Sequence, residues 1–169
     1  SDTLRATRSL LQRLGYQVSI PSRQGCCGAL HQHNGRPAKA RQLAEANLDA
    51  FAGGNEPVLT FATGCAVQLI GYRTRYPQAA DFARRVKDII DYLAEDAASL
   101  LRFKPLPETV ALYIPCTQRN ALRQQNTLIN ILAQIPQLKT VTVNPDCGFC
   151  GSAGSYWLTQ ATLSDLLGD

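Results

Sequence analysis

The sequence has no apolar stretch that approaches the roughly 20 residues needed to cross a bilayer. Residues 1–20 also lack the apolar core of a secretion signal, so we expect a soluble, cytosolic protein. Charged residues are scarce, at 18% of the 169 residues, whereas hydrophobic residues make up 45%. A chain of this composition can bury an apolar interior, which excludes disordered, collagen-like and low-complexity proteins.

The charge balance is nearly even. Seventeen Lys and Arg against thirteen Asp and Glu give a net charge of +4, and the basic residues are spread along the chain. No basic stripe of the kind that nucleic-acid binding requires is present. The length allows one full-sized domain or two half-sized ones that share a core, which excludes a large multidomain enzyme.

Six cysteines are the unusual feature of the composition. They are too few to build a disulfide miniprotein, and a core of this size does not need them as staples. Cys26 and Cys27 are adjacent, Cys147 and Cys150 form a C-x-x-C, and the remaining two, Cys65 and Cys116, stand alone. Adjacent cysteines bridge each other only with backbone strain, but both can point at one metal centre. Metal or redox chemistry is therefore the leading hypothesis.

The hydrophobic pattern predicts alternating helices and strands. Helical spacing predicts helices over residues 3–14, 37–51, 66–72, 118–136 and 159–167, and one long helix that follows Pro77 and carries an apolar stripe to Leu101. Strands are predicted over residues 16–20, 57–62, 109–114 and 139–143. This alternation favours an α/β protein whose parallel sheet is covered on both faces.

The two parts of the chain repeat one order of elements. Residues 3–28 run helix, strand, Cys-Cys-Gly, and residues 118–151 run helix, strand, Cys-x-x-Cys-Gly. We therefore predict two pseudo-repeated Rossmann-like halves with mostly parallel sheets, truncated at both ends as in an excised fragment. The first cysteine-rich half is expected at 1–76 without its first strand, a connecting helix and linker at 77–107, and the second cysteine-rich half at 108–169 without its last strand.

The predicted strands end where the cysteines begin. Because the carboxyl ends of parallel strands share one edge of a sheet, the thiols that follow them are expected to converge. Glycines beside the cysteines let the backbone approach a bound group and donate N–H bonds to sulfur. We predict two pockets of three metal-binding thiols each, Cys26, Cys27 and Cys65 in the first half and Cys116, Cys147 and Cys150 in the second, with Gly25, Gly28, Gly64 and Gly151 as cofactor-binding residues.

Other interpretations of the cysteines stay open. They could bind zinc and tie the two halves together as a docking domain, or Cys147 and Cys150 could act as a dithiol redox site. Isolated cysteines such as Cys65 and Cys116 are also common as small buried hydrophobic residues. For His31 and His33, which follow Cys27 closely, we favour a polar loop over a role as metal ligands.

The motifs resemble a known family. Gly25-Cys26-Cys27-Gly28-Ala29-Leu30-His31 and Cys150-Gly151-Ser152-Ala153-Gly154-Ser155-Tyr156 look like the paired cysteine-rich CCG domains of heterodisulfide reductase and related iron–sulfur oxidoreductases, in particular the C-terminal region of the glycolate oxidase iron–sulfur subunit. The likeness spans nearly the whole chain, and the intervals from Cys27 to Cys65 and from Cys116 to Cys150 fit the family pattern. Two positions depart from it. Phe149 replaces a cysteine before Cys150, and Gln68 stands where the family has the last cysteine of a C-x-x-C.

The resemblance implies an electron-transfer fragment of a flavin-dependent oxidoreductase of the glycolate or lactate type, with no catalytic residues of its own. Its cofactor would be an iron–sulfur cluster of the 4Fe–4S type, the non-cubane form being the alternative, and truncation could leave the cluster absent. The expected partners are a flavin-containing subunit and the ferredoxin-like domain of the parent chain. We expect a cytoplasmic location, either free or peripheral to the inner membrane through partner subunits.

Overall fold

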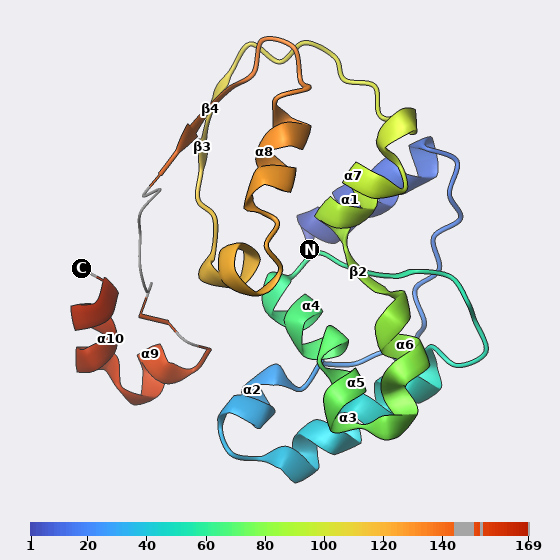
Figure 1. The fold of residues 1–169 in the computed structure, drawn as a ribbon, viewed down its shortest axis with the longest axis vertical. Coiled ribbons are helices and arrows are strands. Elements are labelled where there is room, and N and C mark those ends of the chain that lie inside the picture. Colours follow the sequence, from blue (N-terminus) through green and yellow to red (C-terminus); the bar gives the residue numbers. More distant parts are fainter. Residues whose placement is uncertain (144–150, 153, 169) are drawn as a thin grey trace.

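The computed structural model describes residues 1–143, 151–152 and 154–168. Helices predominate in this part of the chain (Figure 1). The α-helices are α1 (Asp2–Arg13), α2 (Ala29–His33), α3 (Pro37–Ala50), α4 (Thr63–Ile70), α5 (Tyr72–Arg75), α6 (Ala80–Arg85), α7 (Ile89–Glu95), α8 (Gln125–Leu132), α9 (Tyr156–Thr159) and α10 (Ala161–Gly168). The strands are β1 (Val58–Thr60), β2 (Val86–Asp88), β3 (Thr109–Leu112) and β4 (Lys139–Thr142), and there are short turns η1 (Pro77–Ala79), η2 (Ala98–Leu100) and η3 (Thr117–Ala121).

The strands form two separate parallel pairs in the described part of the chain. Strand β1 pairs with β2 so that Val58 lies opposite Val86, and β3 pairs with β4 so that Thr109 lies opposite Lys139. Each pair is joined by intervening helices, as a parallel connection requires. The β1–β2 pair is largely buried, whereas most residues of β3 and β4 are exposed. The protein is thus mixed α/β and mostly helical. Its strand pairs are parallel, as expected, but β3 and β4 are not covered on both faces.

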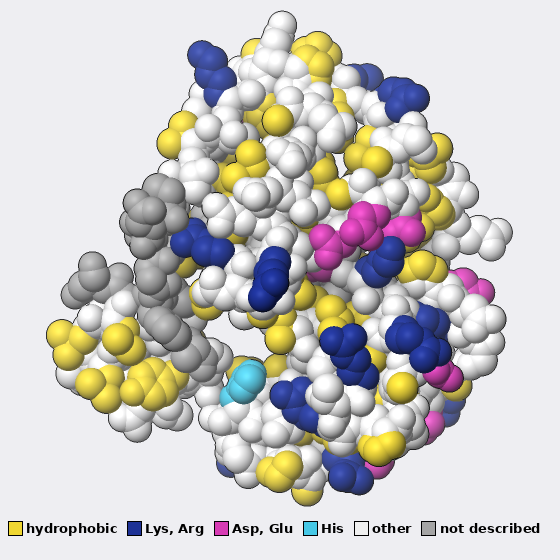
Figure 2. Space-filling model, in the orientation of Figure 1, with side chains coloured by type: hydrophobic (Ala, Val, Ile, Leu, Met, Phe, Trp, Pro, Cys, Tyr) yellow, Lys and Arg dark blue, Asp and Glu magenta, His cyan; other side chains and the backbone are white. Residues whose placement is uncertain are grey.

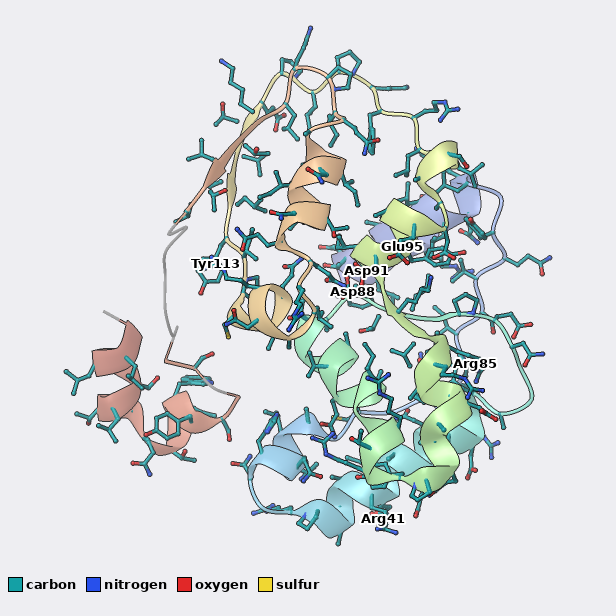
Figure 3. The ribbon with its side chains drawn as sticks, in the orientation of Figure 1. Arg41, Arg85, Asp88, Asp91, Glu95 and Tyr113 are labelled. Atoms are coloured by element: carbon teal, nitrogen blue, oxygen red, sulfur yellow. The ribbon has the colours of Figure 1, made fainter. Side chains whose placement is uncertain are left out.

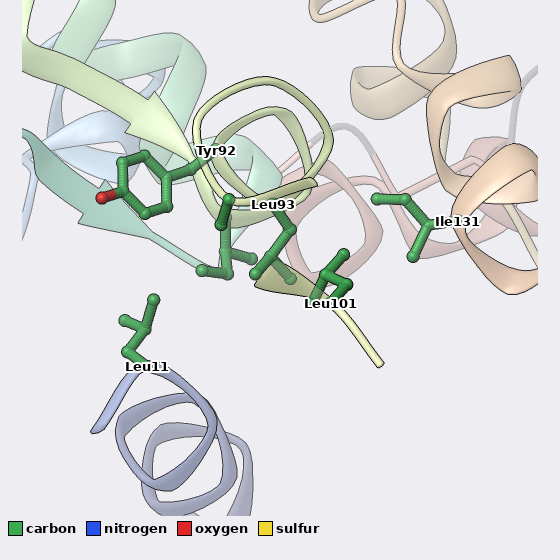
Figure 4. Packing of buried hydrophobic residues seen from close by; sticks show 7 residues of the cluster. Leu11, Tyr92, Leu93, Leu101 and Ile131 are labelled. Atoms are coloured by element: carbon green, nitrogen blue, oxygen red, sulfur yellow. The ribbon is translucent and has the colours of Figure 1, made fainter. Parts of the chain in front are cut away.

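One apolar cluster joins α1, α7 and α8 (Figure 4). Leu11 of α1, Leu93 of α7 and Ile131 of α8 are buried in it. Tyr16 packs edge-on against Tyr92, with ring centroids 5.6 Å apart. Residues that lie far apart in the sequence therefore share this core.

A second apolar cluster, the aromatic cluster, is rich in aromatic rings and contacts the loop that carries Cys26 and Cys27. Tyr72 stacks on Phe82 with centroids 6.0 Å apart, and Tyr76 meets Tyr72 edge-on at 5.4 Å. Arg41 of α3 covers the outer face of the Tyr76 ring, with 5.7 Å between the guanidinium carbon and the ring centroid. Arg85 of α6 (Figure 3) donates to the carbonyls of Phe51, which caps α3, and of Gly54 in the loop that follows. These contacts fix α3, α5 and α6 relative to one another.

The long helix predicted after Pro77 is wrong, because Val86–Asp88 forms strand β2 in its middle. The apolar stripe is real, but its two parts enter different cores: Phe82 and Val86 lie in the aromatic cluster, and Leu93 lies in the other. Asp88 ends the strand and starts α7, since its carboxylate accepts the Ile90 N–H at 2.9 Å. The division of the chain into 1–76, 77–107 and 108–169 stays a prediction.

Two further expectations differ from the structure. Residues 16–20 form no strand, and Tyr16 and Val18 instead pack against the α1–α7 cluster. The helix predicted over 118–136 is split into the π-helical turn η3 and α8. Gln124, at the break, is buried and donates to Asp91 at 2.6 Å, so a polar tertiary contact replaces a continuous helix there.

Candidate metal centre

Cys27 and Cys65 meet although 38 positions separate them in sequence. Cys27 lies in the loop before α2, and Cys65 lies in the first turn of α4, just after β1. Their Sγ atoms are 3.3 Å apart. Cys27 is 7% exposed, and Cys65 is half-buried. The prediction that a strand end would bring Cys65 to the Cys26–Cys27 loop is confirmed for this pair.

The loop is held from below by two buried polar side chains. Asn47 of α3 accepts the Gly25 N–H at 2.9 Å and donates to the Cys26 carbonyl at 3.0 Å. Tyr72 of α5 donates its hydroxyl to the Cys27 carbonyl at 2.7 Å. Three backbone groups of the loop are thus satisfied, so the positions of the two adjacent cysteines are set by helices elsewhere in the chain.

Gly28 turns the chain from this loop into α2. Its φ of 82° is in the left-handed region, and a Cβ there would lie 3.3 Å from the backbone of Ala40. Its N–H donates to Cys26 Sγ at 3.4 Å. Such N–H to sulfur bonds are among the contacts that tune thiolate-bound clusters. Glycine is therefore required here both by conformation and by the close approach of α3.

The thiols affect one another's ionisation. Cys27 donates a hydrogen bond to Cys65, which lowers the pKa of Cys65 to about 7 despite its partial burial. The same bond, together with burial, raises the pKa of Cys27. Cys26 is exposed, but its charge also acts on Cys65 and raises that pKa. Of the two thiols, Cys65 is therefore the one that loses its proton more readily.

The donor set fits a thiophilic metal. Two thiolates bound to one tetrahedral ion at about 2.3 Å lie about 3.8 Å apart. The Cys27 and Cys65 sulfurs, at 3.3 Å, would need to separate by only about half an ångström. Tetrahedral sulfur sites suit zinc and iron–sulfur clusters alike. Across 1–143, 151–152 and 154–168, however, no group of three or more His, Cys, Asp and Glu side chains is arranged to hold an ion.

Two segments that are far apart in the sequence meet beside Cys65 and Cys116. Thr63, two residues before Cys65, shares a 2.7 Å hydrogen bond with Thr117, the residue after Cys116. Cys116 itself is half-buried at the start of η3. Cys147 and Cys150 lie outside the described residues. The first turns of α4 and η3, each of which follows a strand, therefore lie side by side.

A further contact comes from the segment that follows Cys150. Ser155 donates its hydroxyl to Asn34 at the end of α2, at 2.7 Å. Gly151 is buried with a φ of 69°, and its carbonyl accepts the Ser164 hydroxyl at 2.9 Å. Helix α2 begins just after Cys26 and Cys27. It therefore lies next to the segment that follows Cys150.

The other predicted residues have different surroundings. Gly25 donates to Asn47 instead of to a sulfur, and Gly64 lies in the first turn of α4. His31 and His33 belong to α2, where His33 is exposed. Figure 2 shows a group of acidic side chains near α7, and Lys and Arg side chains over α3, α5 and α6 as well as on other parts of this face.

Sequence reasoning missed two polar residues that matter here, Asn47 and Tyr72, and singled out Gln68 only as a departure from the family's C-x-x-C. Asn47 lies on the apolar face of its helix and is 3% exposed, and that mismatch was the available signal. Gln68, one turn after Cys65, is 4% exposed and its Nε2 has no hydrogen-bond partner. A buried unsatisfied donor beside the thiol pair is consistent with a site built for a bound anionic group.

Comparison with known proteins agrees with these motifs. Residues 1–70 match the family model of the CCG cysteine-rich domain. Residues 1–70 are a CCG cysteine-rich domain. The resemblance predicted from the cysteine motifs is thereby confirmed. No solved structure matches the chain.

Relatives cover nearly the whole chain. The chain is 32% identical over 180 residues to the glycolate oxidase iron-sulfur subunit of Escherichia coli (strain K12). This match covers 99% of the chain and 44% of that relative. It is 30% identical to the probable glycolate oxidase iron-sulfur subunit of Bacillus subtilis (strain 168), covering 96% and 38%. Lactate utilization protein A of Geobacillus thermodenitrificans (strain NG80-2) is 24% identical, covering 98% and 72%. The chain spans less than half the length of either glycolate oxidase relative.

The helices also bear on membrane insertion. Among the described helices, none combines the length and the apolar character that a bilayer span needs.

Proposed function

We propose that this CCG chain is an electron-transfer part of the iron–sulfur subunit of a flavin-dependent 2-hydroxy acid oxidoreductase of the glycolate or lactate type. The observation that carries the proposal is the 3.3 Å contact between the Cys27 and Cys65 sulfurs, which pairs two thiols of the CCG pattern across a long stretch of sequence. The names of the relatives, glycolate oxidase iron-sulfur subunit and lactate utilization protein A, support the choice of complex.

In this proposal Cys26, Cys27 and Cys65 hold an iron–sulfur group of the 4Fe–4S type. Such a group, when bound, exchanges single electrons. Cys116, Cys147 and Cys150 would serve the second half in the same way, within the two pseudo-repeated Rossmann-like halves predicted for the chain. Three thiols are one fewer than the usual four, so each site would need a further ligand.

The protein's own groups would act as positioning elements. Asn47 and Tyr72 hold the loop carbonyls, so that the sulfurs of adjacent cysteines are presented without loss of loop order. The Gly28 N–H, already directed at Cys26 Sγ, would stabilise negative charge on that sulfur. Electrons would enter from a flavin-containing subunit through a ferredoxin-like domain of the parent chain, and the chain would oxidise no substrate itself.

The test is metal and sulfide analysis of protein purified or reconstituted without oxygen. We expect iron with acid-labile sulfide and broad absorbance near roughly 400 nm from thiolate-to-iron charge transfer. Cys65→Ser should lower the iron content of the first site. Zinc without sulfide would instead assign a structural or docking role, and a protein that takes up neither metal would reject the proposal.

Cys116→Ser is a useful comparison because it changes a half-buried cysteine at the corresponding position of the other half. If the two halves bind separately, each single variant should retain part of the iron. If either variant loses all of it, the hydrogen-bonded starts of α4 and η3 belong to one common site.

A further inference from the structure

The contact that favours metal binding also has the requirements of a disulfide site. Cys27 and Cys65 are both free thiols, and their sulfurs at 3.3 Å are in van der Waals contact. A disulfide needs the sulfurs at about 2.05 Å, so closure takes a movement of little more than one ångström. The contact joins sulfurs that come from two different parts of the fold, the loop before α2 and the first turn of α4.

Contacts within the protein hold Cys27 and Cys65 close together whether or not a metal is bound. Cys27 is tied to the aromatic core through its carbonyl and Tyr72, and Cys65 belongs to the first turn of α4. Since both anchors are made by protein groups, the two sulfurs stay neighbours in the metal-free chain. Cys26 is a poor competitor because adjacent cysteines bridge only with strain, and its exposed side chain accepts the Gly28 N–H.

We propose that Cys27 and Cys65 form a thiol–disulfide exchange site that reacts with small organic disulfides when no metal is bound. Metal binding and disulfide formation then exclude each other, because they use the same sulfurs. The proposal does not depend on which metal the protein binds, or on the electron-transfer role, since it concerns the metal-free chain.

The exchange proceeds in two balanced steps. The sulfur of Cys65, the more accessible of the two, attacks one sulfur of a disulfide R–S–S–R as thiolate, and R–S⁻ leaves with the electron pair of the broken bond. Cys27 then attacks the Cys65 sulfur of this mixed disulfide, its proton passes to the second departing R–S⁻, and the Cys27–Cys65 bond forms. Two protein thiols lose two electrons in total, and one disulfide is reduced to two thiols.

The experiment uses the whole chain, freed of metal by a chelator without oxygen and then treated with glutathione disulfide. Remaining thiols are alkylated, and linked peptides are mapped by mass spectrometry. We expect a Cys27–Cys65 link that reduced glutathione reverses. Links from Cys26 to either partner, or no intramolecular link at all, would overturn the proposal. Because this experiment uses metal-free protein, its outcome does not depend on whether the protein binds iron.

Serine variants test the order of the steps. Cys27→Ser should accumulate a stable mixed disulfide on Cys65, because the resolving thiol is gone. Cys65→Ser should lose the intramolecular link completely. Cys116→Ser should form the Cys27–Cys65 link to the same extent as the unchanged protein, and loss of the link in that variant would contradict the assignment.

Discussion

Tyr72 donates its phenolic hydrogen to the carbonyl oxygen of Cys27 over 2.7 Å, from a side chain with no exposed surface. Burial raises the pKa of Tyr72 to about 12, so the hydroxyl stays protonated and remains a donor at any physiological pH. The aromatic cluster and the cysteine loop are therefore joined by a hydrogen bond whose donor keeps its proton over this pH range. This bond connects packing in the protein interior to the positions of the candidate ligands.

Removing the Tyr72 hydroxyl should weaken the metal-free protein. In Tyr72→Phe the ring is retained, but the Cys27 carbonyl loses its buried partner, which costs about 1–3 kcal/mol. Denaturant unfolding monitored by circular dichroism measures the difference. Tyr76→Phe is the matched control, because Tyr76 is a buried tyrosine of the same cluster at 5% exposure and is expected to change stability less. Equal losses in the two variants would contradict a special role for Tyr72.

Asn47 makes two hydrogen bonds to the same loop, and Asn47→Ala should therefore destabilise it more specifically. We expect a loss of about 1–3 kcal/mol in the free energy of unfolding, because the Gly25 N–H and the Cys26 carbonyl lose their partner. Faster alkylation of Cys27 would report loosening of the loop. Glu45→Ala, which changes an exposed residue of the same helix, should leave both measurements unchanged.

Two glycines with similar backbone angles separate strain from crowding. Gly28 and Gly35 both have positive φ, 82° and 68°, so alanine at either should cost about 1–2 kcal/mol from backbone conformation. Only at Gly28 would the new Cβ also meet Ala40, whereas at Gly35 it would meet nothing within 4 Å. Gly28→Ala should therefore be the more destabilising variant in thermal or denaturant unfolding. The reverse order would show that α3 does not confine the cysteine loop.

Gln68 is expected to respond in the opposite direction. Its Nε2 is buried without a partner, a cost of about 1–3 kcal/mol, so Gln68→Leu should raise the stability of the metal-free chain. Gln12→Leu, at an exposed site on α1, is the control for helix preference and added apolar area, with an expected change within about 0.5 kcal/mol. A destabilised Gln68→Leu protein would indicate that this amide has a partner in solution.

Local sequence patterns were sufficient to predict much of the secondary structure. Helix α3 was predictable because Pro37 fits a first helical position and the apolar residues that follow keep helical spacing. Strands β1, β3 and β4 were predicted within two residues at each end. Strand β2 could not be recognised, since Val86 fits the helical stripe equally well. It is a strand because β1 lies alongside it, and that pairing is a tertiary contact.

The candidate site also contains residues that the sequence could predict and residues that it could not. The CCG spacing marked Cys26, Cys27 and Cys65 as candidates from sequence alone, because sulfur chemistry restricts which residues can serve. Asn47 and Tyr72 act through backbone carbonyls, which every residue has, so no motif marks them. Only folding reveals which carbonyls they reach. The sequence signal for Asn47 was its position on the otherwise apolar face of α3.

The carboxylate of Asp88 makes stability depend on pH. Asp88 caps α7 near Asp91 (Figure 3), and its pKa is raised by burial and by the nearby Asp91 charge, while its bond from the Ile90 N–H opposes the shift. A raised folded-state pKa means that the group favours folding below the unfolded pKa of about 3.9 and that this contribution is lost as pH rises through the folded pKa. At neutral pH the buried charge therefore costs stability.

Asp88→Asn keeps an oxygen for the Ile90 N–H but carries no charge, and asparagine caps helices as well as aspartate does. The variant should be more stable than the unchanged protein at pH 7, and its advantage should shrink on acidification and vanish below about pH 4. Unfolding free energies measured from about pH 3 to 8 test this. Asp49→Asn, at an exposed carboxylate on α3, controls for the loss of one negative charge. If Asp88→Asn is less stable at pH 7 and the gap narrows in acid, the carboxylate is stabilising and its pKa is lowered, contrary to the burial argument.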